Sequence, residues 1–543
     1  MAIVAVQACR SMMCCGAAFH DRCRINSSYF TLLIRVTEEG NTSVWGVIAE
    51  KKERRLNRQT FCSCEEASME TPRHKLGLCA LLALVVGSMI GGGIFSLPQN
   101  MAASASPGAM LIGWSITAVG MLALVFVFQT LANRKPELDA GIYAYAKAGF
   151  GDYLGFSSAW GYWISAWLGN VSYFVLLFST LGFFFPAFGD GNTPLAVLCA
   201  SMLLWSVHWL VSRGIQQAAY INIVTTVAKV VPLVMFIVLA SIGFRLDVFT
   251  LDIWGQANPD LGNVMDQVRN MMLVTVWVFI GVEGASIYSS KARERRDVGR
   301  ATVLGFLGVL LLLVMVNVLS MGIMSQPELA GLKNPSMALV LSHVVGPWGG
   351  YLISAGLAIS LLGALLSWTL LCAEILRAAS SDGTMPAALS RENVNKVPVK
   401  ALWLSNGLIQ VFLLLTLLSE STYLSLLYLA SSMILVPYLW SAAYALMLTL
   451  KGEGYEGSPE DRLKDACISG LATLYALWLL YAGGIQYLLL SALLYAPGAI
   501  LFIWAKRERG EAVFKRYEMI IFMATVGAFA LAVAGLYQGW LSL

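Results

Sequence analysis

The sequence predicts an all-α membrane protein with about 13 transmembrane helices. Of its 543 residues, 58% are hydrophobic and 13% are charged, whereas a soluble domain carries about 25% charged residues. Apolar segments recur along most of the chain, and many reach the roughly 20 residues that a spanning helix needs. The net charge of +4 is too small to indicate a nucleic-acid partner, so the expected partner is the lipid bilayer.

Residues 1–68 differ from the rest of the chain. They hold a basic run, KKERRLNR at 51–58, and six of the ten cysteines, but no long apolar segment. We expect an N-terminal extension that is either a disordered cytoplasmic tail or an artefact of the start site, because METPRHKLG from Met69 leads directly into the first span. The four other cysteines are single and no pair has zinc-finger spacing, so we expect no metal site and no cofactor.

Thirteen segments qualify as spans by length and hydropathy. They are residues 78–101, 109–132, 153–185, 194–212, 217–243, 265–289, 301–324, 339–378, 401–419, 422–449, 465–482, 484–505 and 518–541. The connecting loops hold 21 lysines and arginines on one side of the membrane and 3 on the other. Since positive residues concentrate in cytoplasmic loops, we expect a cytoplasmic N-terminus and an extracytoplasmic C-terminus. Spans 1–10 would lie within 69–450, and spans 11–13 within 451–543.

Glycine interrupts two of these spans. The first contains GSMIGGGIF (87–95), with four glycines in nine residues, and the sixth contains VWVFIGVEGAS (276–286). Backbone that leaves a helix within a membrane must face protein or a cavity rather than lipid. The two spans are five apart, so two halves of five helices would be inverted, and paired interruptions of this kind indicate a midplane binding site. For a single glycine cluster, close packing of helices is the alternative.

Several motifs resemble those of one transport family. They are GSMIGGGIFSLPQNM (87–101), ANRKPELDAGIYAYAKAGFG (132–151), YWISAWLGN (162–170), WVFIGVEGAS (277–286) and SWTLLCAEILRAASSDGTMP (367–386). In this order they resemble the basic amino acid/polyamine antiporters of the amino acid–polyamine–organocation superfamily, from about Met69 to the C-terminus. The resemblance implies two inverted five-helix repeats of the LeuT-like kind, with broken helices 1 and 6, plus peripheral helices. It also implies exchange of external arginine for internal ornithine across the inner membrane, as in the bacterial arginine deiminase pathway, and a homodimer such as relatives often form.

Other functions fit the same sequence. A lysine exchanger, an arginine/agmatine exchanger or a proton-coupled importer of basic amino acids could share this fold. A membrane sensor that binds an amino acid without transporting it is a second class, although no signalling domain is visible. An enzyme is not expected, because the four histidines are not paired at ligand spacing and no nucleophile motif, phosphate loop or catalytic pair of carboxylates is present.

The two ends of an amino acid substrate should meet the two interruptions. Freed amides at the N-terminus of a half-helix favour an anion, which predicts a site for the α-carboxylate in the first span. Its residues are Met89, Ile90, Gly91, Gly92 and Gly93. The α-amino group is expected at carbonyls of the sixth span, near Trp277, Phe279 and Ile280. In related arginine/agmatine antiporters a serine occupies the position of Gly92, so here the amides would act alone.

The resemblance also assigns side chains to the site. Trp368 is expected to stack on the guanidinium or the aliphatic stem of the substrate, a contact worth about 0.5–2 kcal/mol, and Trp277 to close over the substrate as a gate. Packing is the alternative for both tryptophans. Family positions that line the substrate side chain match Ser165, Ala166 and Asn170. An interhelical hydrogen bond is the alternative for Asn170, and Tyr162 matches a gate tyrosine on the external side.

Glu283 and Lys229 are ionisable and lie within spans, where such residues are costly and usually functional. Glu283 could complement a cationic substrate, act in gating, or be a protonated glutamate bonded to loosened backbone. In some proton-coupled relatives a fifth-span lysine places its ammonium where sodium-coupled members hold sodium. For Lys229 this implies either bracing of the first and eighth spans or a part in coupling.

Overall fold

The computed structural model describes residues 77–138, 141–214, 219–283, 295–418, 422–456 and 459–541. The extension predicted for residues 1–68 lies outside these ranges. Every regular element within them is helical, which confirms the predicted fold class. Ten helices within the described ranges are long and apolar enough to cross a membrane. They are α6 (Pro107–Arg134), α8 (Asp152–Gly182), α9 (Pro194–Ser212), α14 (Arg295–Met321), α17 (Pro347–Ser381), α18 (Val399–Leu415), α19 (Thr422–Lys451), α20 (Pro459–Ala482), α21 (Gly484–Glu508) and α22 (Arg516–Gln538).

The three other predicted spans are not among these ten helices. The first span is two helices, α4 (Leu78–Met89) and α5 (Gly93–Ala102), and the fifth is α10 (Ala219–Gly243). The sixth begins as α12 (Val264–Trp277), and the chain then runs in turns from Val278 to Glu283. The predicted interruptions of the first and sixth spans are therefore present. The remainder of the sixth span lies outside the described residues, so the total of thirteen spans stays a prediction.

The prediction of one continuous eighth span over residues 339–378 is wrong. Two helices occupy it, α16 (Ser336–Val345) and α17, and Gly346 separates them. Gly346 has a φ of +89°, a conformation that glycine adopts far more readily than other residues. Pro347 follows as the first residue of α17, where its missing N–H costs nothing.

Short helices occupy the connections. The loop expected between the second and third spans contains α7 (Ile142–Phe150), which packs against α8 and α19. Glycines with positive φ, Gly141 and Gly151, stand at its two ends. The other short elements are η2 (Pro186–Phe188), α11 (Leu246–Phe249), η3 (Pro259–Leu261), α15 (Gln326–Ala330), η5 (Ala387–Ser390) and η6 (Thr416–Leu418).

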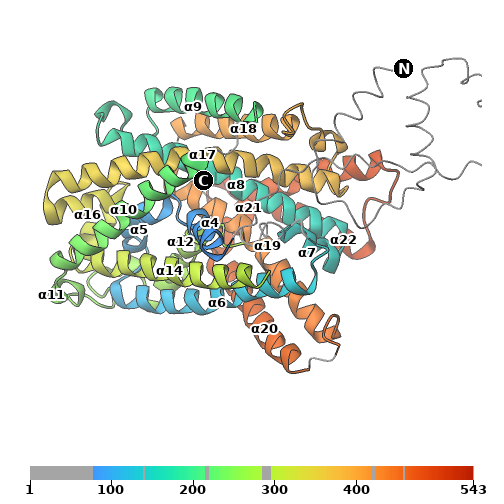
Figure 1. Cartoon of the computed structure of the whole chain (residues 1–543), viewed down its shortest axis with the longest axis horizontal. Helices are drawn as coiled ribbons and strands as arrows, with labels where there is room; N and C mark the ends of the chain where they lie inside the picture. The colour runs from blue at the N-terminus through green and yellow to red at the C-terminus, as the bar shows by residue number, and fades with distance from the viewer. Residues whose placement is uncertain are drawn as a thin grey trace, which may run out of the picture. The chain divides into compact units, whose positions relative to one another are not determined.

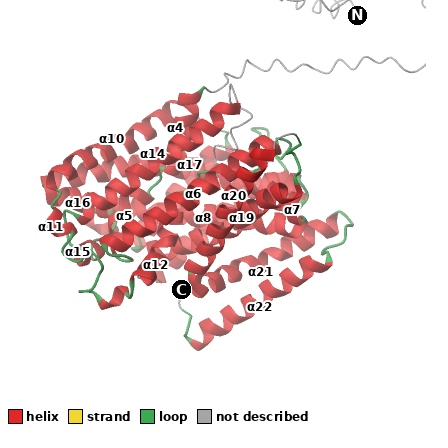
Figure 2. Ribbon diagram, turned by 90° about the horizontal axis from the view of Figure 1, so that it is seen from below, coloured by secondary structure: helices red, strands yellow, loops and turns green. Residues whose placement is uncertain are grey.

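Helix α8 forms the centre of the packing. Within its most apolar segment, 89% of the residues of α8 are buried in the protein, against 11% for α22. Helix α8 packs against both α17 and α19. Figures 1 and 2 show the peripheral helices in pairs, with α9 beside α18 and α21 beside α22. Because lipid can solvate an apolar helix, α22 needs little protein contact. The interrupted helices and α8 therefore form the interior of the protein, where a binding site would lie.

Candidate functional site

The interruption of the first span leaves backbone donors unpaired. The Ile90 amide donates to the Val86 carbonyl (2.9 Å) and closes α4, and the Phe95 amide donates to the Gly92 carbonyl (3.2 Å) at the start of α5. Between them, the amides of Gly92, Gly93 and Ile94 have no backbone partner among the described residues. All three residues are buried. Free amides at a helix N-terminus are able to bind an anion, so the carboxylate site predicted from the glycine run stays a prediction that these amides could serve.

The interruption of the sixth span begins where α12 ends, at Trp277. The amides of Phe279 and Ile280 each turn back three residues, to the carbonyls of Val276 (3.0 Å) and Trp277 (3.3 Å). Gly281 follows with a φ of +107°. This tight turning replaces the α-helical hydrogen-bond pattern and places the Gly281 carbonyl against the first span.

A hydrogen bond joins the two interruptions. The Ser88 hydroxyl, near the end of α4, shares its proton between the Gly281 carbonyl at 3.2 Å and the Val85 carbonyl of its own helix at 2.9 Å. A Cβ atom at Gly281 would lie 2.9 Å from the Ser88 carbonyl oxygen, so only glycine permits this approach. The two breaks therefore lie in direct contact although they are 193 residues apart in sequence.

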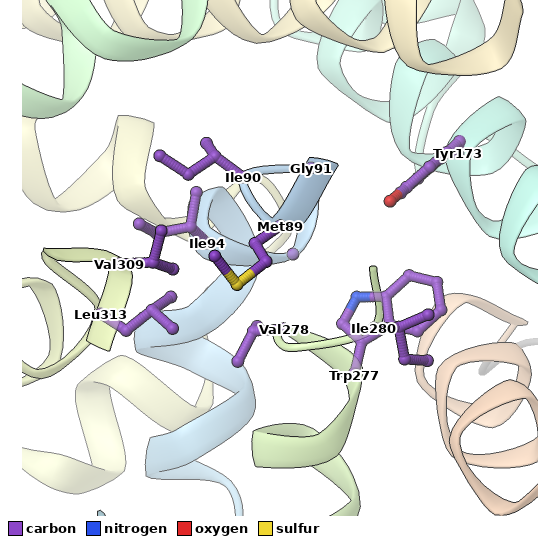
Figure 3. Close-up of a pocket in the computed structure, with 11 residues that line it drawn as sticks. Met89, Ile90, Gly91, Ile94, Tyr173, Trp277, Val278, Ile280, Val309 and Leu313 are labelled. Atoms are coloured by element: carbon purple, nitrogen blue, oxygen red, sulfur yellow. The ribbon is translucent and has the colours of Figure 1, made fainter. Parts of the chain in front are cut away.

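One pocket lies between the two breaks (Figure 3). It is lined by Met89, Ile90, Gly91, Gly93, Ile94, Tyr173, Trp277, Val278, Ile280, Val309 and Leu313. Six of the predicted site residues thus meet at one place, from Met89 to Gly93 without Gly92, and at Trp277 and Ile280. Tyr173 on α8 and two apolar residues of α14, Val309 and Leu313, were not predicted for the site.

The glycine run also allows other helices to approach. A Cβ atom on Gly91 would collide with the Tyr173 hydroxyl, and one on Gly93 would lie 2.7 Å from the indole nitrogen of Trp277. At Gly92 it would lie 2.7 Å from Leu176. The glycines therefore both interrupt the helix and make room for α8 and α12, so the two explanations considered for the run hold together.

Trp277 forms one wall of the pocket. Its ring is 5.8 Å from that of Tyr173, centroid to centroid, at an interplanar angle of 60°. Its opposite edge faces Gly169 of α8, where an added Cβ would lie 3.4 Å from the ring. The indole is thus held between Gly93 and Gly169, next to the free amides of α5.

Glu283 is fully enclosed by hydrogen-bond donors. The carboxylate accepts from the Gly281 amide (3.1 and 3.2 Å) and from the Tyr438 hydroxyl (2.9 Å), and Tyr162 is a further partner. Its side chain is buried, yet it is not among the residues that line the pocket. These contacts fix the turn after Gly281 and connect it to α8 and α19.

Lys229 reaches the first span from α10. Its ammonium donates to the Gly87 carbonyl at 3.1 Å, two residues before the end of α4. The residue is only 8% exposed. A buried ammonium requires such partners because desolvation of an unpaired charge is costly, and the contact links α10 to the interrupted helix.

Comparison with known proteins places the chain in a family. The family model described as amino acid permease matches residues 76–483. The chain belongs to the amino acid permease family. Its interrupted first and sixth spans, with the pocket between them, lie inside the region that this family model covers.

Curated relatives match nearly their whole lengths. An arginine/ornithine antiporter of Pseudomonas aeruginosa is 69% identical over 475 residues, which are 86% of this chain and 98% of that protein. An L-lysine transport protein of Corynebacterium glutamicum is 46% identical over 503 residues (90% and 100%), and an arginine/agmatine antiporter of Chlamydia caviae is 41% identical over 469 (84% and 96%). The chain is therefore a multi-pass membrane protein of a transport family rather than an enzyme family.

The remaining site residues predicted for this permease lie outside the pocket lining. Asn170 donates to the sulfur of Cys372 on α17 at 3.8 Å, and its carbonyl oxygen and the Ser165 hydroxyl have no partner in the described parts of the chain. Ala166 is buried on the same helix, and Trp368 is half-buried on α17. The pocket residue Tyr173 follows Asn170 by three positions, so the helical spacing of that face was the signal that could have identified it.

Proposed function

We propose that the chain exchanges arginine for ornithine across the inner membrane by alternating access, as in the arginine deiminase pathway. The pocket between two interrupted spans carries the proposal, because paired interruptions supply unpaired backbone groups at the membrane midplane. The Pseudomonas relative, named an arginine/ornithine antiporter and 69% identical, supports this pair of substrates. Each substrate carries about one net positive charge at neutral pH, so the exchange moves no net charge.

The α-carboxylate would bind the free amides at the start of α5, at Gly92, Gly93 and Ile94. The α-ammonium would bind carbonyls of the turn that follows Trp277. Closure of the Trp277 ring over the substrate would separate it from one side of the membrane. The side chain of the substrate would then extend toward α8 and α17, where the predicted contacts are Ser165, Ala166, Asn170 and Trp368.

We propose an N-terminus in the cytoplasm and a C-terminus outside it, on the basis of the charge asymmetry of the loops. In this orientation α8 enters from the cytoplasm, so Tyr162 and Glu283 lie on the cytoplasmic side of the pocket. The family resemblance places Tyr162 on the external side, whereas this orientation would place it on the cytoplasmic side. Hydrogen bonds between Tyr162, Tyr438 and Glu283 would hold that side closed and would break when substrate leaves inward.

Lys229 would brace the interrupted first span and remove any need for sodium. Its contact with the Gly87 carbonyl supports bracing, since the contact holds the end of α4. Residues 69–450 would form the transporter core and residues 451–543 the last three spans. Deletion of residues 1–68 should then leave exchange intact. A homodimer stays a prediction from the family resemblance.

Exchange in proteoliposomes tests the proposal. Labelled arginine should enter only when ornithine or arginine is loaded inside, and equal uptake into empty vesicles would contradict obligatory exchange. Binding without any flux would instead identify a sensor. Relatives named for lysine and for arginine/agmatine make those substrates the second candidates, and competition by unlabelled lysine or agmatine measures them directly.

A further inference from the structure

The hydroxyl of Tyr173 faces the pocket without a partner. The residue is 7% exposed and lines the pocket, and Figure 3 shows its oxygen directed toward Gly91 and Trp277. No hydrogen bond to this hydroxyl is present in the described parts of the chain. A buried hydroxyl that lacks a partner is costly. An unsatisfied donor directed into a pocket therefore points to a ligand.

The same end of the pocket holds further unpaired donors. The Tyr173 oxygen occupies the space that a Cβ atom of Gly91 would need, which places it beside the residue that precedes the free amides of Gly92 and Gly93. A side chain at Gly92 would first have to displace the ends of two leucine side chains, because its Cβ would lie 2.7 Å from Leu176 and 2.8 Å from Leu361. The hydroxyl reaches this position from α8 instead.

The donor set matches a carboxylate. One phenol O–H and the N–H groups of a helix N-terminus lie at this end of the pocket. None of the described residues that line the pocket carries a charge. A carboxylate offers two oxygens with about four acceptor positions, and hydrogen bonds to an ionised acceptor are the strong ones. A decarboxylated amine offers no acceptor, so it would leave these donors unpaired inside the pocket.

We propose that Tyr173 determines specificity by donating a hydrogen bond to the substrate α-carboxylate, so that the site selects amino acids over the corresponding decarboxylated amines. The inference rests on the proposed function and deepens it, because it names the group that separates arginine from agmatine. The ring of Tyr173 packs against Trp277 whether or not its hydroxyl binds a substrate. Only the hydroxyl oxygen of Tyr173 would distinguish amino acids from the decarboxylated amines.

Tyr173→Phe is the direct test, since it removes that oxygen and keeps the ring. Displacement of labelled arginine from the purified full-length protein by arginine, lysine, agmatine and cadaverine gives the affinities. We expect the affinities for arginine and lysine to fall about 10- to 100-fold, as the loss of one hydrogen bond to a charged group requires. The affinities for the two amines should stay unchanged or rise.

Two further variants separate this loss from misfolding. Tyr475→Phe is the control, because the Tyr475 hydroxyl on α20 is also buried but lies away from the pocket, near Thr117 and Thr275. It should keep wild-type affinities. Gly91→Ala, whose new Cβ would displace the Tyr173 hydroxyl, should repeat the selective loss for amino acids.

The outcomes distinguish the inference from the proposed function. An unchanged affinity for arginine in Tyr173→Phe, or an equal loss for arginine and agmatine, overturns the role of Tyr173. If the wild-type protein does not exchange arginine for ornithine but Tyr173→Phe still weakens amino acids selectively, the proposed function fails and the carboxylate contact stands.

Discussion

Gly93→Ala should impair transport because it forces Trp277 out of its position. The added Cβ would lie 2.7 Å from the indole nitrogen and 2.8 Å from Cδ1, whereas carbon atoms in contact prefer about 3.5–4.0 Å. The ring must therefore move by about 1 Å, yet Gly169 of α8 supports its other edge. Overpacking of this kind costs about 1–3 kcal/mol. If this strain destabilises the substrate-binding state, the rate of arginine uptake decreases about 5- to 150-fold.

The assay is the initial rate of labelled arginine uptake into ornithine-loaded proteoliposomes, together with the melting temperature of the purified variant. Gly308→Ala is the control, since a Cβ at this glycine of α14 meets nothing within 4 Å. It should preserve uptake, and alanine is the better helix former by about 1 kcal/mol. Wild-type uptake in Gly93→Ala would refute the reasoning, because the indole could then not lie where we place it.

Three other changes should have measurable effects. Lys229→Ala should abolish arginine uptake while protein is still made, and uptake that becomes sodium-dependent would support the ion-substitute role. Trp368→Leu should strongly reduce arginine uptake, and unchanged kinetics would remove this residue from the site. Lys506→Met breaks contacts of 2.6 Å to both Asp152 and Glu511, and should destabilise the protein by about 1 kcal/mol, since Asp152 is 32% exposed and partly screened. Hydrogen bonding to Lys506 lowers the pKa of Glu511. The contact therefore stabilises at neutral pH and is lost as pH falls through that lowered pKa, so the variant should show a weaker loss of melting temperature in acid.

The interrupted helices could be predicted because their signals are local. A run of glycines in an apolar segment weakens the helix wherever that segment lies, and the observed break at 90–92 falls within the predicted stretch 87–95. Hydropathy located the long spans for the same reason. The break at Gly346 also had a local signal, the Gly-Pro pair that punctuates helices, but uninterrupted hydropathy on both sides concealed it.

The composition of the pocket could not be predicted in the same way. Val309 and Leu313 are ordinary apolar residues of a long helix, and only the packing of α14 against α4 and α5 brings them to the breaks. Conversely, family resemblance indicated Asn170 and Trp368, but these side chains lie outside the pocket lining. A family resemblance indicates the role of a residue, whereas the lining of the pocket depends on how the helices pack around the two breaks.

The hydrogen bonds around the first break are asymmetric, and this asymmetry indicates which half-helix is left for a ligand. The end of α4 is held twice, by the Ser88 contact to Gly281 and by the Lys229 contact to Gly87. The start of α5 keeps the amides of Gly92 and Gly93 unpaired among the described residues. A carboxylate bound there would supply the acceptors that the interrupted helix lacks. Substrate would thus complete the hydrogen bonding of α5, and its departure would expose those donors again, which couples occupancy to the stability of this half-helix.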